Sequence, residues 1–163
     1  KSWAVTGTKC ERKHNIINSL SLVPEELEKL NFERYEKYKT IEENEVMYEE
    51  YMMDDATICV SAFGIAARVA KNAIAMARAE GIKVGMIRPI TLWPFPAKAF
   101  KAAAEKVDSF ISVELSMGQM IDDIKASVEY KKPVTLCNRA GGMIPSPEMV
   151  LEAIREANKG GNR

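Results

Sequence analysis

Apolar and polar positions alternate along the last two thirds of the chain in a pattern typical of an α/β sheet. From about Thr57 onward, short apolar runs alternate with longer stretches in which apolar residues recur every three or four positions. The first kind of run predicts a buried strand, and the second predicts a helix with one apolar face. The predicted strands cover residues 57–63, 83–88, 110–114 and 133–137. Because strands and helices alternate with short links, an open, mostly parallel sheet with helices on both faces is expected.

The helix after the first predicted strand has a readable face and a readable end. Ile65, Val69, Ala73 and Met76 recur at helical spacing, so they are predicted to form its apolar face against the sheet. Gly81 is expected to end this helix, because glycine accepts the left-handed backbone conformation found just beyond many helices.

Two later helices carry their own signals. Met117 and Met120 begin an apolar stripe that continues to about residue 128, and both methionines are expected in the core. The last helix is predicted to begin with Ser146 as its N-cap and Pro147 as its first helical residue. Both residue types are favoured at those positions.

The segment before Thr57 differs in periodicity and in charge. Residues 24 to about 53 are predicted to be helical, as two helices or one bent helix, because their apolar positions do not form one stripe. Residues 25–55 contain twelve Asp/Glu and four Lys/Arg, a net charge of −8. They are read either as a solvated helical face or as an arm held by a basic neighbour. The predicted organisation is a leader and acidic helical arm over 1–55 and an α/β domain over 56–163.

Composition narrows the functional classes. The chain has 163 residues, of which 47% are hydrophobic, and this suits one ordinary core. It carries no net charge. No apolar run reaches the roughly 20 residues that a membrane span needs, so a cytoplasmic protein without a membrane partner is expected. There is no basic stripe interleaved with aromatic residues, so no nucleic-acid partner is expected. The cysteines at 10, 59 and 137 form no Cys-x-x-Cys pair, and no metal site is expected.

Candidate chemistry lies where the predicted strands end, because ligands of open α/β sheets bind at the carboxyl ends of the strands. No catalytic residue can be assigned, and the only histidine, His14, is expected in a solvated position or a domain contact. The weak candidates for cofactor binding at these ends are Ser61, Gly64, Arg88, Glu114, Gly118, Arg139, Gly141 and Gly142.

Two of these candidates allow opposite interpretations. Glu114 could act as an acid or base, or it could cap the helix that follows it. Arg139 with Gly141 and Gly142 could hold an anion, or the glycines could simply form a turn. The first strand end has neither a Gly-x-Gly-x-x-Gly pattern nor a phosphate loop with a following lysine.

Three segments, in order along the chain, resemble a known family. They are EGIKVGMIRPITLWPFP at 80–96, VELSMGQM at 113–120 and RAGGMIPSP at 139–147. They resemble the C-terminal domain of alpha subunits of 2-oxoacid:ferredoxin oxidoreductases, especially the 2-oxoisovalerate type. More distantly, they are similar to the C-terminal domain of transketolase. The resemblance covers about 56 to the end, and less tightly the leader at 3–7 and the arm at 34–38.

The resemblance implies a part of an enzyme rather than a complete one. Such enzymes use thiamine diphosphate to decarboxylate a 2-oxoacid oxidatively, pass electrons through iron–sulfur clusters to ferredoxin and form an acyl-coenzyme A. Thiamine diphosphate, magnesium and the clusters are expected in other domains or subunits of the complex, and none in this chain. The chain is then a structural and assembly domain that is not catalytic alone. Its expected partners are the other subunits, with ferredoxin and coenzyme A at the level of the complex.

An alternative of a different class stays open at this point. The chain could be a free-standing anion- or nucleotide-binding α/β module, with Arg88 and Arg139 in one strand-end pocket. It predicts a saturable anion site in the isolated chain, whereas the assembly domain predicts exposed apolar surface.

Overall fold

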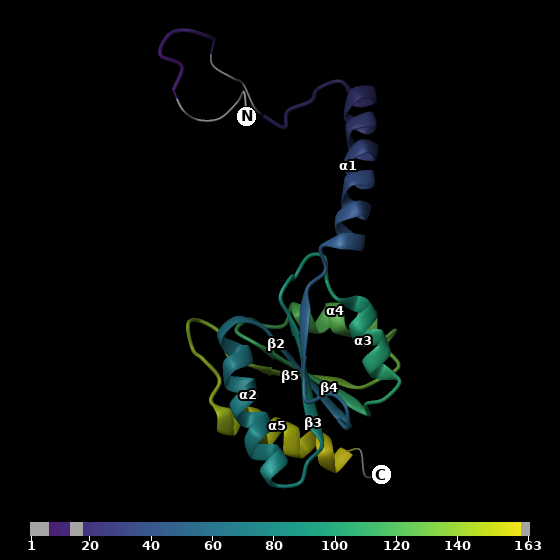
Figure 1. Ribbon diagram of the computed structural model, residues 1–163, viewed down its shortest axis with the longest axis vertical. Coiled ribbons are helices and arrows are strands. Elements are labelled where there is room, and N and C mark those ends of the chain that lie inside the picture. Colours follow the sequence, from purple (N-terminus) through teal and green to yellow (C-terminus); the bar gives the residue numbers. More distant parts are fainter. Residues whose placement is uncertain (1–6, 14–17, 161–163) are drawn as a thin grey trace. The chain divides into compact units, whose positions relative to one another are not determined.

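The computed structural model describes residues 7–13 and 18–160 (Figure 1). His14 and most of the leader segment at 3–7 lie outside these described residues. The chain divides into two compact units, 1–39 and 40–163. Its elements are α1 (Pro24–Asn44), β1 (Tyr48–Tyr51), β2 (Ile58–Ala62), α2 (Gly64–Ala79), β3 (Val84–Pro89), α3 (Ala97–Ala104), β4 (Ser109–Glu114), α4 (Met120–Ser127), β5 (Val134–Asn138) and α5 (Pro147–Gly160).

The sheet is open and mostly parallel, as the alternation predicts. Its strand order is β1-β3-β2-β4-β5. β2 to β5 run parallel, and β1 pairs antiparallel with β3 at one edge, with Glu49 opposite Arg88. The chain leaves β2 toward β3 and then crosses back to β4 on the other side. The topological switch point of the fold therefore lies between β2 and β4.

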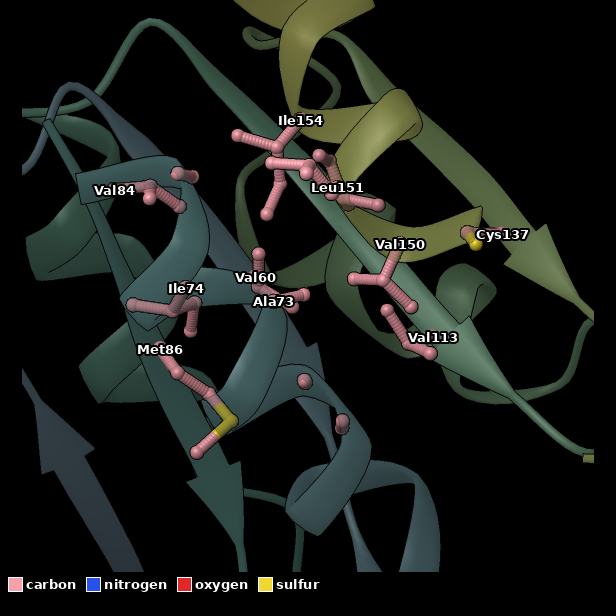
Figure 2. Packing of buried hydrophobic residues seen from close by; sticks show 14 of the residues in the cluster. Val60, Ala73, Ile74, Val84, Met86, Val113, Cys137, Val150, Leu151 and Ile154 are labelled. Atoms are coloured by element: carbon pink, nitrogen blue, oxygen red, sulfur yellow. The ribbon is translucent and has the colours of Figure 1, made fainter. Parts of the chain in front are cut away.

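Helices cover both faces of the sheet, which confirms the predicted fold class. α2 and α5 pack on one face, where Ile74 of α2 and Val150 and Ile154 of α5 meet Val60 and neighbouring strand residues (Figure 2). α3 and α4 pack on the other face around Phe100, Phe110, Met120 and Ile124. The ring centroids of Phe100 and Phe110 lie 6.2 Å apart in a tilted arrangement.

The buried face of α2 differs from the predicted one. Ile65 and Met76 are exposed, and the buried side chains of this helix are mostly alanines. Small side chains let a helix approach a sheet and a second helix closely, so the alanine stripe faces the core and the longer side chains lie outside it. The buried residues of α2 are Ala66, Ala67, Ala70, Ala73, Ile74 and Ala77.

The two methionines of the predicted stripe differ in burial. Met120 is buried, as predicted, whereas the prediction for Met117 is wrong, because its side chain is 80% exposed. The helix begins only at Met120, so Met117 lies in the preceding turn and leaves the helical stripe. Other local signals are confirmed, since Ser146 Oγ accepts the N–H of Met149 at 3.2 Å and Gly81 has φ of 83° just after α2.

The predicted helix over 24–53 is too long. α1 is one helix that ends at Asn44, and residues 48–51 form the edge strand β1. The Tyr-Glu-Glu-Tyr sequence of β1 alternates half-buried and exposed residues, which suits an edge strand once β3 is beside it. Contacts group β1 with the sheet in the unit 40–163, whereas the sequence places the division at 55 and 56.

The acidic segment is partly a solvated helical face and partly held by basic neighbours. Among the residues that can be described, α1 buries none, as a solvated face would require. Glu49 and Asp55, however, are held by basic neighbours, with Asp55 Oδ1 2.7 Å from Nη2 of Arg78. Across the described helices, none combines the length and apolar character that crossing a membrane requires.

Candidate functional site

The eight predicted site residues fall into three places along the carboxyl edge of the sheet. Gly64 and Arg88 line one groove beside α2. Ser61, Glu114 and Gly118 belong to the ends of β2 and β4, at the switch point. Arg139, Gly141 and Gly142 follow β5 on the far side.

Arg88 and Arg139 are not brought together. β2 and β4 lie between β3 and β5, so the strands that carry the two arginines are separated by three strand spacings, roughly 14 Å. Arg139 is exposed, and its backbone N–H donates to the carbonyl oxygen of Glu114 at 3.2 Å. Gly141 and Gly142 have φ of 65° and 86°, so they serve the turn before α5.

Glu114 is the most strongly bound polar side chain at this edge. It is only 2% exposed, and its carboxylate accepts five hydrogen bonds. The donors are the hydroxyls of Ser112 and Ser116 at 2.8 Å and the backbone N–H groups of Gln119 at 2.8 Å, Met120 at 3.1 Å and Ile121 at 2.9 Å. The helix-capping interpretation is therefore confirmed, because three of these donors begin α4.

Two opposing effects set the proton affinity of Glu114. Burial alone raises the pKa of this carboxyl, but the hydrogen bonds from Gln119, Ser112, Ser116 and Ile121 together outweigh it and lower the pKa below its ordinary value. A carboxylate held ionised by so many donors is a poor general acid. Its role in this arrangement is to anchor the turn between β4 and α4.

A cavity of about 290 Å³ opens at the switch point above this anchor. Phe63, Leu92, Leu115 and Met120 give it apolar walls. Its polar lining comes from Glu114, Ser116, Gln119 and Asp123. Ser61 does not face a ligand, because it is fully buried and its hydroxyl lies 3.6 Å from the sulfur of Met120.

Gly118 has a steric role beside this cavity. Its φ is 104°, and a Cβ added there would lie 3.2 Å from side-chain carbons of Ile121 and Leu136. The residue is glycine because the turn into α4 passes close to β5, and no cofactor contact is needed to explain it.

A second, larger hollow of about 530 Å³ lies beside α2, and it is cationic. Arg68 and Lys71 of α2 and Arg88 of β3 line it. Glu49 of β1 reaches both Lys71 Nζ at 2.6 Å and Arg88 Nη1 at 2.9 Å. The hydrogen bond from Lys71, and then that from Arg88, lowers the pKa of Glu49. Sequence reasoning missed this group because Glu49 was assigned to the predicted helix over 24–53 rather than to a strand beside Arg88.

Large apolar side chains are exposed in every loop that follows a parallel strand. Trp93 is 54% exposed and Met117 80%. The set comprises Phe63 after β2, Ile90, Leu92 and Trp93 after β3, Leu115 and Met117 after β4, and Met143 and Ile144 after β5. Phe63, Leu92 and Leu115, from three of these loops, line one hollow at the switch point. The exposed apolar side chains at these strand ends are called the apolar carboxyl edge. The sequence signal for it was the Ile-Thr-Leu-Trp run at 90–93, which was used only as part of the segment that resembles a known family.

No arrangement for catalysis is found in the described part of the chain. Cys59 and Cys137 are buried on opposite faces of the sheet and cannot share a ligand. Within residues 7–13 and 18–160, no three His, Cys, Asp or Glu side chains are placed to hold a metal ion.

Comparison with known proteins finds a matching family model and a similar subunit. The family model described as "Pyruvate:ferredoxin oxidoreductase core domain II" matches residues 56–150. The ketoisovalerate oxidoreductase subunit VorB of Methanothermobacter marburgensis is 50% identical over 155 residues. That match covers 95% of this chain and 44% of the relative, so the chain spans less than half of the relative's length.

Two solved structures share the fold. One is a 2-oxoglutarate:ferredoxin oxidoreductase from Magnetococcus marinus with 2-oxoglutarate, coenzyme A and succinyl-CoA bound, with a TM-score of 0.66 and 21% identity. The match covers 83% of this chain and 24% of that one. The other is a split-gene transketolase, an inactive beta4 tetramer, with a TM-score of 0.59, 17% identity and coverage of 68% and 41%.

Proposed function

We propose a function that starts from one premise: this chain belongs to the pyruvate:ferredoxin oxidoreductase core domain II family. Within that family, the chain acts as the transketolase C-terminal-like domain of an alpha-type subunit of a 2-oxoisovalerate:ferredoxin oxidoreductase. The choice of 2-oxoisovalerate is supported by the 50% identity to a ketoisovalerate oxidoreductase subunit. The whole complex then converts a 2-oxoacid oxidatively to an acyl-coenzyme A and passes the electrons to ferredoxin.

The contribution of this domain is assembly, and the apolar carboxyl edge is the observation that carries this proposal. Single exposed apolar residues are common on proteins, but a contiguous apolar patch marks a surface that another protein covers. Here Phe63, Leu92 and Leu115, from the loops after three parallel strands, line one hollow, and Met117 in the third of these loops is 80% exposed. We propose that a neighbouring domain of the same oxidoreductase covers this surface, because the ketoisovalerate oxidoreductase subunit is more than twice as long as this chain.

The proposal places the cofactors outside this chain. Thiamine diphosphate with magnesium and the iron–sulfur clusters belong to other domains or subunits, since the described cysteines do not converge and Glu114 is committed to capping α4. Coenzyme A and ferredoxin are partners of the complex, which is cytoplasmic. The domain acts on catalysis by orienting its neighbours, and small misplacements of catalytic groups cost much activity.

Anaerobic purification of the native complex tests this function. The masses of the copurifying chains, the bound iron and the bound thiamine diphosphate are measured together with 2-oxoacid-dependent ferredoxin reduction. We expect companion subunits that carry both cofactors, and faster turnover with 2-oxoisovalerate than with 2-oxoglutarate. A cofactor-free protein without companions would contradict the assembly function, and a preference for 2-oxoglutarate would contradict the substrate.

A further inference from the structure

The groove beside α2 gathers more positive charge than the fold itself requires. Arg68 and Lys71 lie three residues apart on α2 and so share one side of the helix. Arg88 reaches the same groove from the end of β3. Three cations that line one groove repel one another, and an anion between them relieves this repulsion.

Glu49 supplies only part of the missing negative charge. Its carboxylate bridges Lys71 and Arg88, and Lys71 also lies 5.1 Å from the centre of the Tyr51 ring. Within the described residues, no hydrogen bond or ion pair is made by the Arg68 guanidinium. Arg88 uses Nη1 for Glu49, and an arginine has five N–H donors in all. With three cations and one carboxylate, the groove keeps a net charge of +2 and several unused donors.

The start of α2 adds to the same field. Gly64 opens the helix with φ of 56° and lines the groove. Phe63 stands at the N-cap position and no side chain caps the helix there, and the first turn has no acidic residue. The first N–H groups of such a helix favour a nearby anion.

We propose that this groove binds the phosphate group of a small phosphorylated molecule. A phosphate monoester carries about −1.5 to −2 charges at neutral pH, which matches the net charge of the groove, whereas one carboxylate would leave half of it unbalanced. Arg68 and Arg88 can each present two parallel N–H groups to phosphate oxygens. The volume of about 530 Å³ exceeds what one phosphate fills, and exposed Ile65 offers an apolar wall for the rest of the ligand.

Titration of the 163-residue chain with inorganic phosphate, glycerol phosphate and acetate, followed by backbone amide NMR, tests the site. Both phosphate compounds should shift the signals of Gly64 and Ile65 with saturation, and acetate should bind more weakly. Equal affinities for inorganic phosphate and glycerol phosphate would assign the site to free phosphate. Tighter binding of glycerol phosphate would assign it to a phosphorylated organic ligand.

Three variants locate the site. Arg68→Ala should weaken phosphate binding about tenfold, because it removes a charge-assisted contact without disturbing any described partner. Arg139→Ala is the matched control and should bind like the unchanged chain, since Arg139 follows β5 on the far side of the sheet. Glu49→Gln should tighten binding, because it removes the competing carboxylate while keeping an acceptor for Lys71.

Two results would overturn the proposal. One is the absence of saturable shifts with either phosphate compound, or equal shifts in the Arg68→Ala chain. The other is acetate binding as tightly as phosphate, which would make the groove a carboxylate site for an acidic side chain of a neighbouring protein.

Discussion

Glu114 shows how a single residue can hold a loop in place. Removing a carboxylate from water is costly unless its oxygens are satisfied, and here five donors satisfy both. One oxygen takes Ser112 and the N–H of Ile121, and the other takes Ser116 and the N–H groups at the start of α4. A glutamine cannot replace this arrangement, because its NH₂ group would face N–H donors.

We therefore expect Glu114→Gln to lower the free energy of unfolding by about 2–4 kcal/mol near neutral pH. The pKa of Glu114 is lowered in the folded chain, so its stabilisation is complete above the unfolded value of about 4.5 and is lost as pH falls through the folded pKa. Urea unfolding of both chains between about pH 7 and pH 3 should show the difference shrinking in acid. Glu105→Gln, an exposed control, should show a small difference at every pH, and a gap that persists in acid would contradict this reading of Glu114.

Gly85 is a second residue whose identity follows from its surroundings. A Cβ at this position of β3 would lie 2.4 Å from the carbonyl oxygen of Met52 and 2.7 Å from the sulfur of Met53. The backbone after β1 therefore crosses directly over the strand, and only glycine leaves room for it.

Gly85→Ala should cost about 2 kcal/mol or more, because a backbone atom has to move to relieve the overlap. Gly160→Ala is the matched control, since a Cβ there meets open space, and it should change stability by less than about 1 kcal/mol. Thermal unfolding of the two chains measures both effects. Equal melting temperatures for Gly85→Ala and the unchanged chain would show that the segment after β1 does not lie on β3.

At the scale of an element, α2 depends on small side chains rather than on large apolar ones. Its buried alanines face both the sheet and α5. The apolar pattern Ile65, Val69, Ala73 and Met76 points to a neighbouring side of the helix, and two of those residues are exposed. The sequence pattern located the helix correctly but assigned two exposed residues, Ile65 and Met76, to its buried face.

Ala73→Leu should destabilise the chain by about 1–3 kcal/mol, because the fully buried site has no room for three more carbons. Ala75→Leu, on the exposed side of the same helix, should be nearly neutral because both residues favour helices. Chemical denaturation of the two variants separates packing from helix propensity. If the two substitutions cost the same, the buried face of α2 has been assigned wrongly.

At the scale of the whole molecule, the proposed assembly role depends on the exposed apolar side chains of the carboxyl edge. Leu92 and Met117 come from loops after two different strands, and both are exposed. Charging them should leave the fold of this chain unchanged while placing unpaired carboxylates in the proposed interface, where burial would be costly.

The double variant Leu92→Glu, Met117→Glu is made in the alpha-type subunit proposed to include this chain, expressed with the other proposed subunits of the complex. We expect at least a tenfold loss of copurifying companions and of 2-oxoacid-dependent ferredoxin reduction, about 1.4 kcal/mol or more of binding. Tyr130→Glu, at an exposed aromatic position between α4 and β5, should behave like the unchanged subunit. Normal assembly of the double variant would refute the interface.

Local pattern was enough for much of this protein. The limits of β2 to β5 agree with the predicted strands within one residue at each end, and the Ser146 cap and the Gly81 stop are where the sequence places them. The α/β class, the parallel strands and the helix before each next strand follow from the same periodicity. These features depend on neighbours within a few residues, so the sequence by itself determines them.

Contacts between distant segments decided the rest. Four residues predicted as helix became β1 because β3 offers an unpaired edge, and Gly85 makes room for the segment that follows. The strand order separates Arg88 from Arg139 and instead joins Arg88 to Arg68, Lys71 and Glu49. Which side chains meet at a site depends on which strands are neighbours, and that is set by packing across the whole sheet. The sequence determined β2 to β5 and the helices that follow them, and only the tertiary structure decided β1 and the cationic groove.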